Sequence, residues 1–349
     1  MELSKEVYDI VTRSRASSKV IQMISPEQDQ NRSVVVIEDG ETLEIGLSRE
    51  VYLTMFKQVH KQWHSWNGEM TDLWRLYYMT LGYLITTHEN HTILRLHEQI
   101  VRQLYDDVND EFLVQEFEMI TVILSSRLKR INKSSCLWYY MKKLTILIIF
   151  QKQWYEKLPI LIDRVFNSCK FHFANYYANN FLKWIIGISY AFGVNDVIGP
   201  RLIQECKTNL KDISLWSTLE TWLYIGNNLH HYIHEYETIS NQLIDSKFEL
   251  SQASALKPPS HKDSWKLQLQ ELDNLFLWLM NVNCCIKYPY VTLFNVIDRS
   301  NTNPAKYVQL LQNYREKIED SVSQLQDSGS IAYTTQATLL STLNSILTR

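Results

Sequence analysis

Three stretches decide the fold of this chain: SSCLWYYMKKLTILI (residues 134–148), ANYYANNFLKWIIG (174–187) and DISLWSTLETWLYI (212–225). Each begins with a short polar stretch and places a large side chain about one turn into a predicted helix. A weaker copy, ENHTILRLHEQI (89–100), precedes them. A period of roughly forty residues is typical of stacked helical repeats, in which hairpins share one continuous core. We therefore expect an all-α stack whose long surface holds another molecule.

The composition agrees with a large helical protein. Of the 349 residues, 45% are hydrophobic and 12% are aromatic, which is enough for a sizeable core. Only 9 glycines and 7 prolines are present, so long helices with short connections are expected. The net charge of −3 provides no global basic field for nucleic acid or an anionic membrane.

Several features of the sequence predict a cytoplasmic protein. The beginning of the chain, MELSKEVYDI, lacks the apolar region of a signal peptide. The most apolar run, Leu144 to Phe150, is much shorter than the roughly twenty residues that span a bilayer, and it is interpreted as a buried helix. The cysteines have no C-x-x-C spacing and are interpreted as reduced thiols without a zinc site. They are Cys136, Cys169, Cys206, Cys284 and Cys285.

Hydrophobic periodicity predicts a first amphipathic helix over residues 3–22. The β-branched run SVVVIEDGETLEI (33–45), with its Asp39-Gly40 turn, predicts a short extended segment or hairpin that packs against the first helices. From about residue 48 onward, every expected element is a helix. The predicted helices cover 49–65, 70–86, 91–106, 111–130, 134–150, 153–169, 175–192, 197–209, 213–228, 230–246, 264–285, 289–298, 304–325 and 332–347.

Four regions follow from this pattern. Residues 1–47 form an amino-terminal helix and short β segment, and residues 48–250 form the helical repeats. Residues 251–263 are a flexible linker or insertion, since Pro258-Pro259 bars a helix there. Residues 264–349 form a carboxyl-terminal repeat and capping helices.

Tryptophans are the expected structural anchors of the repeats. Burying one removes about 150–250 Å² from water, worth on the order of 4–6 kcal/mol as an upper estimate. Replacing a core tryptophan by alanine should then cost about 3–5 kcal/mol. The proposed anchors are Trp138, Trp184, Trp216 and Trp222.

Few residues point to chemistry, because no phosphate-binding glycine loop, nucleophile elbow, H-E-x-x-H or dinucleotide fingerprint is present. His230 and His234 lie one helical turn apart beside Glu235, and two imidazoles at this spacing can bind a metal. No third ligand is identifiable, so a solvated helix edge is the simpler interpretation and no metal is predicted. His60 and His64 share the spacing and receive less weight still.

Two other groups have structural as well as functional interpretations. The run RLKR (127–130), followed by Lys133, would offset the dipole at a helix end or form a basic surface for a partner. Asn175 stands where a helix begins and suits a cap, and the aromatic residues after it suit packing on the previous hairpin. Capping and packing account fully for the second group.

The repeats resemble those of the protein prenyltransferase alpha subunits, which read approximately N-x-x-x-x-W-x-x-R. Trp138 and Trp216 match the family tryptophan, with Met141 and Leu219 at the arginine. YVTLFNVIDR, near Phe294, is a weak final copy. The likeness extends from about residue 5 to 300, although no repeat keeps the full signature.

The segment ANYYANNFLKW resembles the family's N-Y-H-A-W-x-x-R-x-W motif. Asn175, Tyr176, Ala178 and Trp184 match, whereas Asn179 replaces the tryptophan, and leucine at position 182 replaces the arginine. Residues 31–37, NRSVVVI, resemble a divergent branch, the prenyltransferase alpha subunit repeat-containing proteins, whose fungal relatives are linked by name to cell-wall organisation.

This resemblance implies a right-handed crescent of antiparallel helical hairpins, an α-α superhelix. It implies a heterodimer with a Rab-geranylgeranyltransferase-type beta subunit, which holds zinc and binds geranylgeranyl diphosphate. The substrate would be an already prenylated SNARE-type protein, modified at a carboxyl-terminal cysteine. This chain would scaffold the beta subunit and select the substrate, with no cofactor of its own.

The same resemblance bears on the site residues. Ala174 occupies the family's catalytic lysine position, with Lys170 and His172 upstream, so the chain would contribute little or no catalysis. Asn175, Tyr176 and Tyr177 would face the substrate or the diphosphate. The alternatives are a helical-repeat adaptor without prenylation activity and, with less support, a free-standing metalloenzyme that uses the pair His230 and His234.

Overall fold

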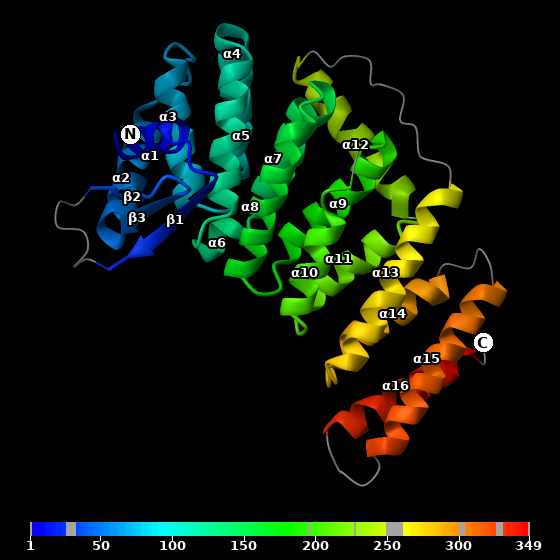
Figure 1. Ribbon diagram of the computed structural model, residues 1–349. Helices are drawn as coiled ribbons and strands as arrows, with labels where there is room; N and C mark the ends of the chain where they lie inside the picture. Colours follow the sequence, from blue (N-terminus) through cyan, green and yellow to red (C-terminus); the bar gives the residue numbers. More distant parts are fainter. Residues whose placement is uncertain are drawn as a thin grey trace. The chain divides into compact units, whose positions relative to one another are not determined.

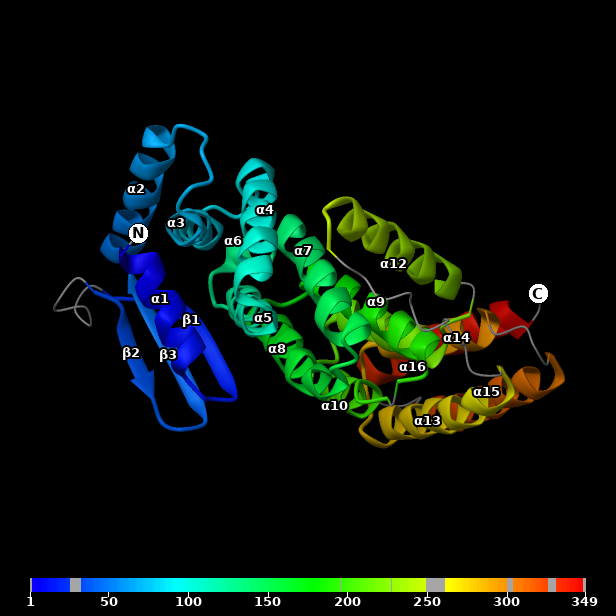
Figure 2. The ribbon, with the colours of Figure 1, turned by 90° about the horizontal axis from the view of Figure 1, so that it is seen from above.

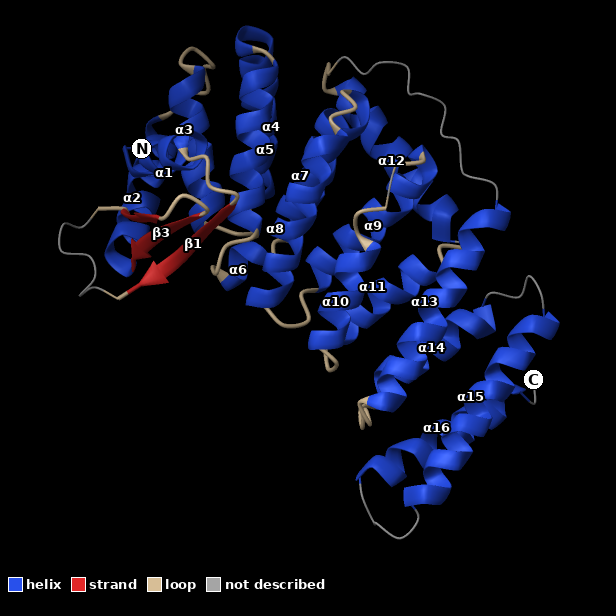
Figure 3. Cartoon of the chain, in the orientation of Figure 1, coloured by secondary structure: helices blue, strands red, loops and turns tan. Residues whose placement is uncertain are grey.

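The computed structural model describes residues 2–25, 33–194, 196–226, 228–248, 261–299, 304–325 and 331–347. Helices dominate this described part (Figure 1), and strands occur near its amino-terminal end (Figure 3). The chain divides into two compact units. Unit 1 is Met1–Leu182 with His234–Ala255, and unit 2 is Lys183–Ile233 with Leu256–Arg349. The expectation of a helical protein is confirmed, with a small sheet added.

The sheet has three strands in the order β1-β3-β2, which Figure 2 shows side by side. Strands β2 (Val35–Glu38) and β3 (Thr42–Ser48) form an antiparallel hairpin, as the sequence predicts. Its turn contains Gly40 with φ of 93°, a left-handed conformation that glycine adopts without a steric penalty. Strand β1 (Ser18–Ile24) pairs with β3 in parallel.

The predicted helix over residues 3–22 is wrong in its second half. Helix α1 (Glu2–Arg13) ends early, and β1 follows it. The buried Lys19 amine donates to the carbonyl oxygens of Val11 (2.7 Å) and Ser14 (2.8 Å), and so satisfies the end of α1. The edge of β3 supplies the partner that turns Ser18–Ile24 into a strand, and a local helical pattern cannot reveal such a partner.

Most predicted helices are present with shifted ends. The prediction over 49–65 matches α2 (Arg49–Ser65). The other helices of unit 1 or of the unit boundaries are α3 (Leu73–Thr86), α4 (His91–Val108), α5 (Asp110–Leu124), α6 (Lys129–Asn132), α7 (Ser135–Thr145), α8 (Leu158–Phe171), α9 (Tyr176–Phe192) and α12 (Asn228–Asp245). A buried π-helix (Ile146–Gln151) continues α7, and a 3-10 turn (Tyr155–Lys157) precedes α8.

Unit 2 contains helices throughout its described residues. They are α10 (Gly199–Thr208), α11 (Ile213–Leu223), α13 (His261–Asn281), α14 (Lys287–Arg299), α15 (Pro304–Leu325) and α16 (Ile331–Leu347). Within the predicted linker 251–263, residues 251–260 lie outside the described residues, and α13 already begins at His261. The four predicted regions of the chain stay predictions.

The single helix predicted over 111–130 is corrected to two helices, α5 and α6. The Ser125 hydroxyl donates to the Thr121 carbonyl oxygen at 2.9 Å. The Asn132 amide donates to the carbonyl oxygens of Leu124 (2.8 Å) and Ser126 (3.3 Å). These side chains satisfy the end of α5, so the helix ends without leaving its last carbonyls unpaired.

The recurring segments each begin a helix, with the same capping geometry. Asn90, Ser134, Asn175 and Asp212 accept a hydrogen bond from the backbone N–H three residues further on, at 3.1, 3.3, 3.3 and 3.1 Å. These caps recur at intervals of roughly forty residues, the period expected of a helical repeat. The arrangement of these helices as a right-handed superhelix of antiparallel hairpins stays a prediction.

The tryptophans of these segments lie inside the protein. Trp184 and Trp216 have no exposed surface, and Trp138 and Trp222 are also buried. The indole of Trp222 donates to Asp196 Oδ2 at 2.9 Å in unit 2. None of the helices in the described ranges combines the length and apolar character needed to cross a bilayer.

Candidate functional site

An exposed aromatic cluster stands where α9 begins. We name Phe173, Tyr176 and Tyr177 the aromatic patch; they are 62%, 63% and 38% exposed. The two tyrosine rings meet edge to face, with centroids 5.5 Å apart. Among the large hydrophobic side chains that are exposed in the described part of the chain, these three are the only aromatic ones. A group of exposed aromatic side chains is typical of a binding surface.

The backbone holds the aromatic patch rigidly. Ala174 has a φ of 51°, a left-handed conformation that is uncommon for any residue except glycine. Asn175 is fully buried, and its side chain caps α9 and donates to Asn132 Oδ1 and to Ser168 Oγ (3.2 Å). Asn175 is therefore a capping residue whose amide is already used, and the aromatic residues on either side of it face the solvent.

Basic residues flank the aromatic patch. The Lys133 amine donates to the Phe173 carbonyl oxygen at 3.5 Å. Burial lowers the pKa of His172, and the nearby charges of Lys133 and Lys129 lower it further. Arg127 stacks over the ring of Phe171 at 4.8 Å. Arg127, Lys129 and Lys133 thus place positive charge beside the patch. The run RLKR extends from the connection after α5 into the beginning of α6, rather than lying at the end of one long helix.

A buried polar network centres on Glu116 of α5. Its carboxylate accepts hydrogen bonds from the hydroxyls of Tyr77 (2.6 Å) and Tyr140 (3.0 Å) and lies 3.0 Å from His97 Nε2. The other imidazole nitrogen, Nδ1, lies 2.8 Å from the Thr80 hydroxyl. Burial raises the pKa of both tyrosines well above 10, and the negative Glu116 raises it further, so both phenols stay protonated donors.

Thr80, His97 and Glu116 reproduce the order of a hydrolytic triad, namely hydroxyl, imidazole and carboxylate. All three side chains have no exposed surface. The Thr80 hydroxyl also lies 3.0 Å from the carbonyl oxygens of Leu76 and Tyr77, within its own helix. A substrate cannot reach these atoms in this structure, so the network serves to join α3, α4, α5 and α7.

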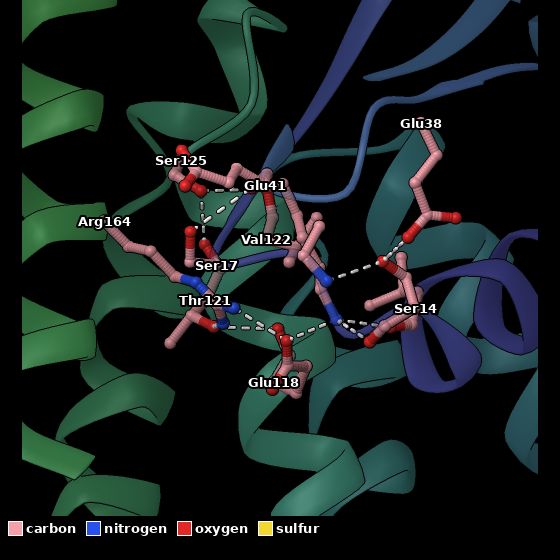
Figure 4. Close-up of polar contacts among 12 residues, drawn as sticks. Ser14, Ser17, Glu38, Glu41, Glu118, Thr121, Val122, Ser125 and Arg164 are labelled. Atoms are coloured by element: carbon pink, nitrogen blue, oxygen red, sulfur yellow. Dashed lines mark hydrogen bonds and ion pairs between the residues drawn. The ribbon is translucent and has the colours of Figure 1, made fainter. Parts of the chain in front are cut away.

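A second carboxylate, Glu118, points from the other side of α5, because residues two apart in a helix lie about 200° apart. Glu118 Oε1 binds the Lys19 amine at 2.8 Å and the Arg164 guanidinium at 2.6 Å. Arg164 also donates to the Thr121 hydroxyl at 2.6 Å, and Figure 4 shows Arg164, Thr121 and Glu118 converging. The cluster links β1, α5 and α8 across unit 1.

The Glu118 cluster predicts a defined acid sensitivity. Burial alone raises the pKa of Glu118, but Arg164 and Lys19 outweigh it and hold the pKa below its usual value. Because the pKa of Glu118 is lower in the folded than in the unfolded state, the carboxylate stabilises the fold at pH values above the unfolded-state pKa of about 4.3. This stabilisation is lost as the pH falls through the folded-state pKa. In urea unfolding, the stability difference between the wild type and Glu118→Gln should be constant near neutral pH and shrink below about pH 4. A difference that stays constant down to about pH 3 would contradict this assignment.

A groove of about 970 Å³ lies in unit 1 along α4, α7 and the end of α12. Some of its charged side chains bind one another or the backbone. Lys143 pairs with Glu98 at 2.8 Å, and Arg102 Nε donates to the Lys247 carbonyl oxygen at 2.7 Å. These contacts indicate no ligand class for the groove.

The histidines predicted from spacing differ in the structure. His230 and His234 are exposed on α12, and Glu235 pairs instead with Lys142 at 2.6 Å. His60 and His64, which received less weight, do meet: their Nε2 atoms are 3.1 Å apart. No group of three or more His, Cys, Asp or Glu suited to a metal occurs among the described residues.

Two carboxylates, the buried Glu116 and the half-buried Glu118, were not predicted from the sequence. Glu116 and Glu118 lie in FLVQEFEMITVIL (112–124), where two acidic residues interrupt an otherwise apolar helix. Acidic side chains are rarely buried without partners, so this pattern was a usable signal of polar networks.

Comparisons with known proteins identify two domains in this chain. Residues 1–125 match the ECM9 N-terminal domain, and residues 137–243 match the ECM9 middle domain. Protein ECM9 of Saccharomyces cerevisiae (strain ATCC 204508 / S288c) is 30% identical over 190 residues, which cover 53% of this chain and 50% of that protein. The matched region thus spans about half the length of this relative. No solved structure matches significantly.

These matches correct the resemblance to prenyltransferase alpha subunits and, with it, the assignment as a geranylgeranyltransferase subunit that selects a SNARE-type substrate. Both domain models and the relative are ECM9, and none is a prenyltransferase alpha repeat. The beta subunit, its zinc and geranylgeranyl diphosphate were expected from that resemblance alone and stay untested predictions. The degenerate motif misled because a capped helix with a buried tryptophan is what any helical stack needs. The two ECM9 domain models match this chain in order, so ECM9 is the family to which residues 1–125 and 137–243 are similar.

Proposed function

We propose that this chain is a protein-binding scaffold whose aromatic patch docks an acidic, partly apolar segment of another protein. The observation that carries the proposal is the joint exposure of Phe173, Tyr176 and Tyr177 beside basic residues. Aromatic side chains are enriched at the energetic centres of protein interfaces. Positive charges at the rim favour a partner of opposite charge.

The rigidity of the surrounding structure supports this function. The cap at Asn175 and the left-handed Ala174 hold the patch in place, so a partner would lose little free energy in ordering it. In this proposal the helices stack as antiparallel hairpins of a right-handed superhelix, the form in which repeat proteins present extended binding surfaces. A cytoplasmic location, predicted from the reduced thiols, belongs to the same proposal.

The polar clusters also favour binding over catalysis. In the described ranges, the triad-like group around Glu116 is sealed in the core, and the Glu118 carboxylate is neutralised by two cations. Such networks rigidify a scaffold rather than act on a substrate.

A displayed peptide library tests the proposal directly. Selection against the full chain should enrich peptides that combine Asp or Glu with an apolar or aromatic residue. The double variant Phe173→Ser/Tyr176→Ser should bind these peptides at least about 30-fold more weakly, as expected for aromatic hot spots. Affinity measured by fluorescence anisotropy, at low and high salt, is the readout.

The matched control is Ile160→Ser, which changes an exposed aliphatic residue (47% exposed) on α8 of the same unit. This variant should bind the selected peptides like the wild type. Equal affinity of the double variant and the wild type, or peptides without acidic enrichment, would refute the proposed surface.

A further inference from the structure

Two histidines on α2 form a close pair. His60 and His64 are exposed and lie one helical turn apart. Their Nε2 atoms are 3.1 Å apart, and the ring centroids are 4.4 Å apart. In the metal-free protein one Nε2–H donates to the other nitrogen, so both nitrogens already face a common point.

Neighbouring side chains orient the first histidine. His60 Nδ1 lies 2.9 Å from the Tyr83 hydroxyl, and the imidazole stacks on Phe56 with centroids 5.2 Å apart. Tyr83 is buried, which fixes its hydroxyl. When Nδ1–H donates to this oxygen, the lone pair of His60 is on Nε2, facing His64. A second hydrogen bond of this kind is the usual support of a metal-binding histidine.

We propose that His60 and His64 form a binding site for a transition-metal ion, with Cu²⁺ preferred over Ni²⁺ and Zn²⁺. At metal–nitrogen distances of about 2.0–2.1 Å, two ligands at a right angle lie about 3 Å apart, and two tetrahedral ligands about 3.4 Å apart. The observed 3.1 Å is nearer the right angle, the geometry of Cu²⁺ and Ni²⁺ sites. Copper also heads the usual order of affinities for divalent ions.

The other coordination positions of this site are open. No third His, Cys, Asp or Glu joins the pair within the described residues, so water or an exchangeable ligand completes the coordination. When the metal binds, the Nε2 proton of His64 leaves to solvent and the exposed Nδ1 of His64 takes up a proton, so both neutral imidazoles present an Nε2 lone pair to the metal. The chain also offers an internal comparison, because His230 and His234 have the same spacing on another helix, α12.

The test uses the full chain without an affinity tag and copper(II) supplied from a glycine buffer. Binding is followed by calorimetry and by the nitrogen hyperfine structure in electron paramagnetic resonance. The wild type should bind one ion with a spectrum of two imidazole nitrogens. His60→Gln and His64→Gln should each weaken binding at least about 10-fold, and Tyr83→Phe should weaken it while both nitrogens remain in the spectrum.

The matched control is His230→Gln/His234→Gln, which should bind copper like the wild type. Circular dichroism should show that all variants keep their helices, since the replaced imidazoles are exposed. The proposal is overturned if His60→Gln/His64→Gln binds copper as tightly as the wild type. It is equally overturned if the wild-type spectrum lacks the two imidazole nitrogens.

Discussion

Replacing Glu116 by alanine should destabilise unit 1 by about 3–5 kcal/mol, the largest effect expected of a single polar substitution in this protein. The carboxylate accepts from Tyr77 and Tyr140 and contacts His97, and all four side chains are buried. Its removal leaves two phenol donors and an imidazole without their acceptor in a site that water does not reach. Burial, the largest cause of the raised pKa of both phenols, persists in this variant, so the hydroxyls cannot escape this cost by ionising.

Urea unfolding followed by circular dichroism measures this effect, using the first transition if the two units unfold separately. Glu111→Ala, an exposed glutamate on the same helix, should change stability by less than about 1 kcal/mol. The loss of stability in Glu116→Gln should lie between those of the two alanine variants. The amide oxygen still accepts one hydrogen bond, whereas the amide NH₂ faces another donor. A Glu116→Ala variant as stable as Glu111→Ala would show that the network does not hold the core together.

Trp138→Ala should lower stability by about 3–5 kcal/mol and clearly lower the melting temperature. The indole is 4% exposed, lies 5.3 Å from the ring of Phe181 and donates from Nε1 to the Asn132 carbonyl oxygen at 2.7 Å. The substitution loses the buried area, opens a cavity and removes the shorter of the two hydrogen bonds to that carbonyl. Asn132 also binds Ser168 and Asn175, so the loss extends to the cap of α9.

The control for this variant is Tyr176→Ala. Tyr176 is 63% exposed at the beginning of α9, so its truncation opens no cavity, and the melting temperature should stay close to that of the wild type. Differential scanning calorimetry of both variants separates the two roles. An unchanged melting curve for Trp138→Ala would remove Trp138 from the core, and a large loss for Tyr176→Ala would make the aromatic patch structural.

The helices from Arg49 onward could be predicted because their signals are local. The capping residues directly precede apolar, aromatic segments; they are Asn90, Ser134, Asn175 and Asp212. Each side chain accepts a hydrogen bond from the backbone N–H three residues further on, as expected of a helix cap. Few glycines and prolines mark where helices end. The predicted helix ends therefore differ by a few residues from those in the structure, although the helices themselves are present. The hairpin of β2 and β3 was predictable for the same reason, since Asp39-Gly40 specifies its turn.

The candidate sites depended on contacts between distant residues and could not be predicted. Glu116 collects its donors from three other helices, and His97 and Tyr140 carry no local sign of that meeting. The two His-x-x-x-His pairs look alike in the sequence, yet only His60 has an orienting tyrosine, Tyr83, on a neighbouring helix. The sequence left two interpretations of Tyr176 and Tyr177, packing on the previous hairpin or facing a ligand. In the structure Asn175 is buried beside them and both rings are exposed.

The amino-acid sequence by itself determined a mostly helical chain with caps recurring about every forty residues, because capping and helical periodicity act within a few residues of each other. Only the tertiary structure decided that Ser18–Ile24 is a strand, that α5 ends at Leu124, and which polar side chains are buried together. Those outcomes depend on partners far away in the chain, such as β3 for β1 and Asn132 for the end of α5. Tertiary packing decides which partner lies beside a strand edge or a buried donor. The packing depends on the whole chain rather than on any one segment.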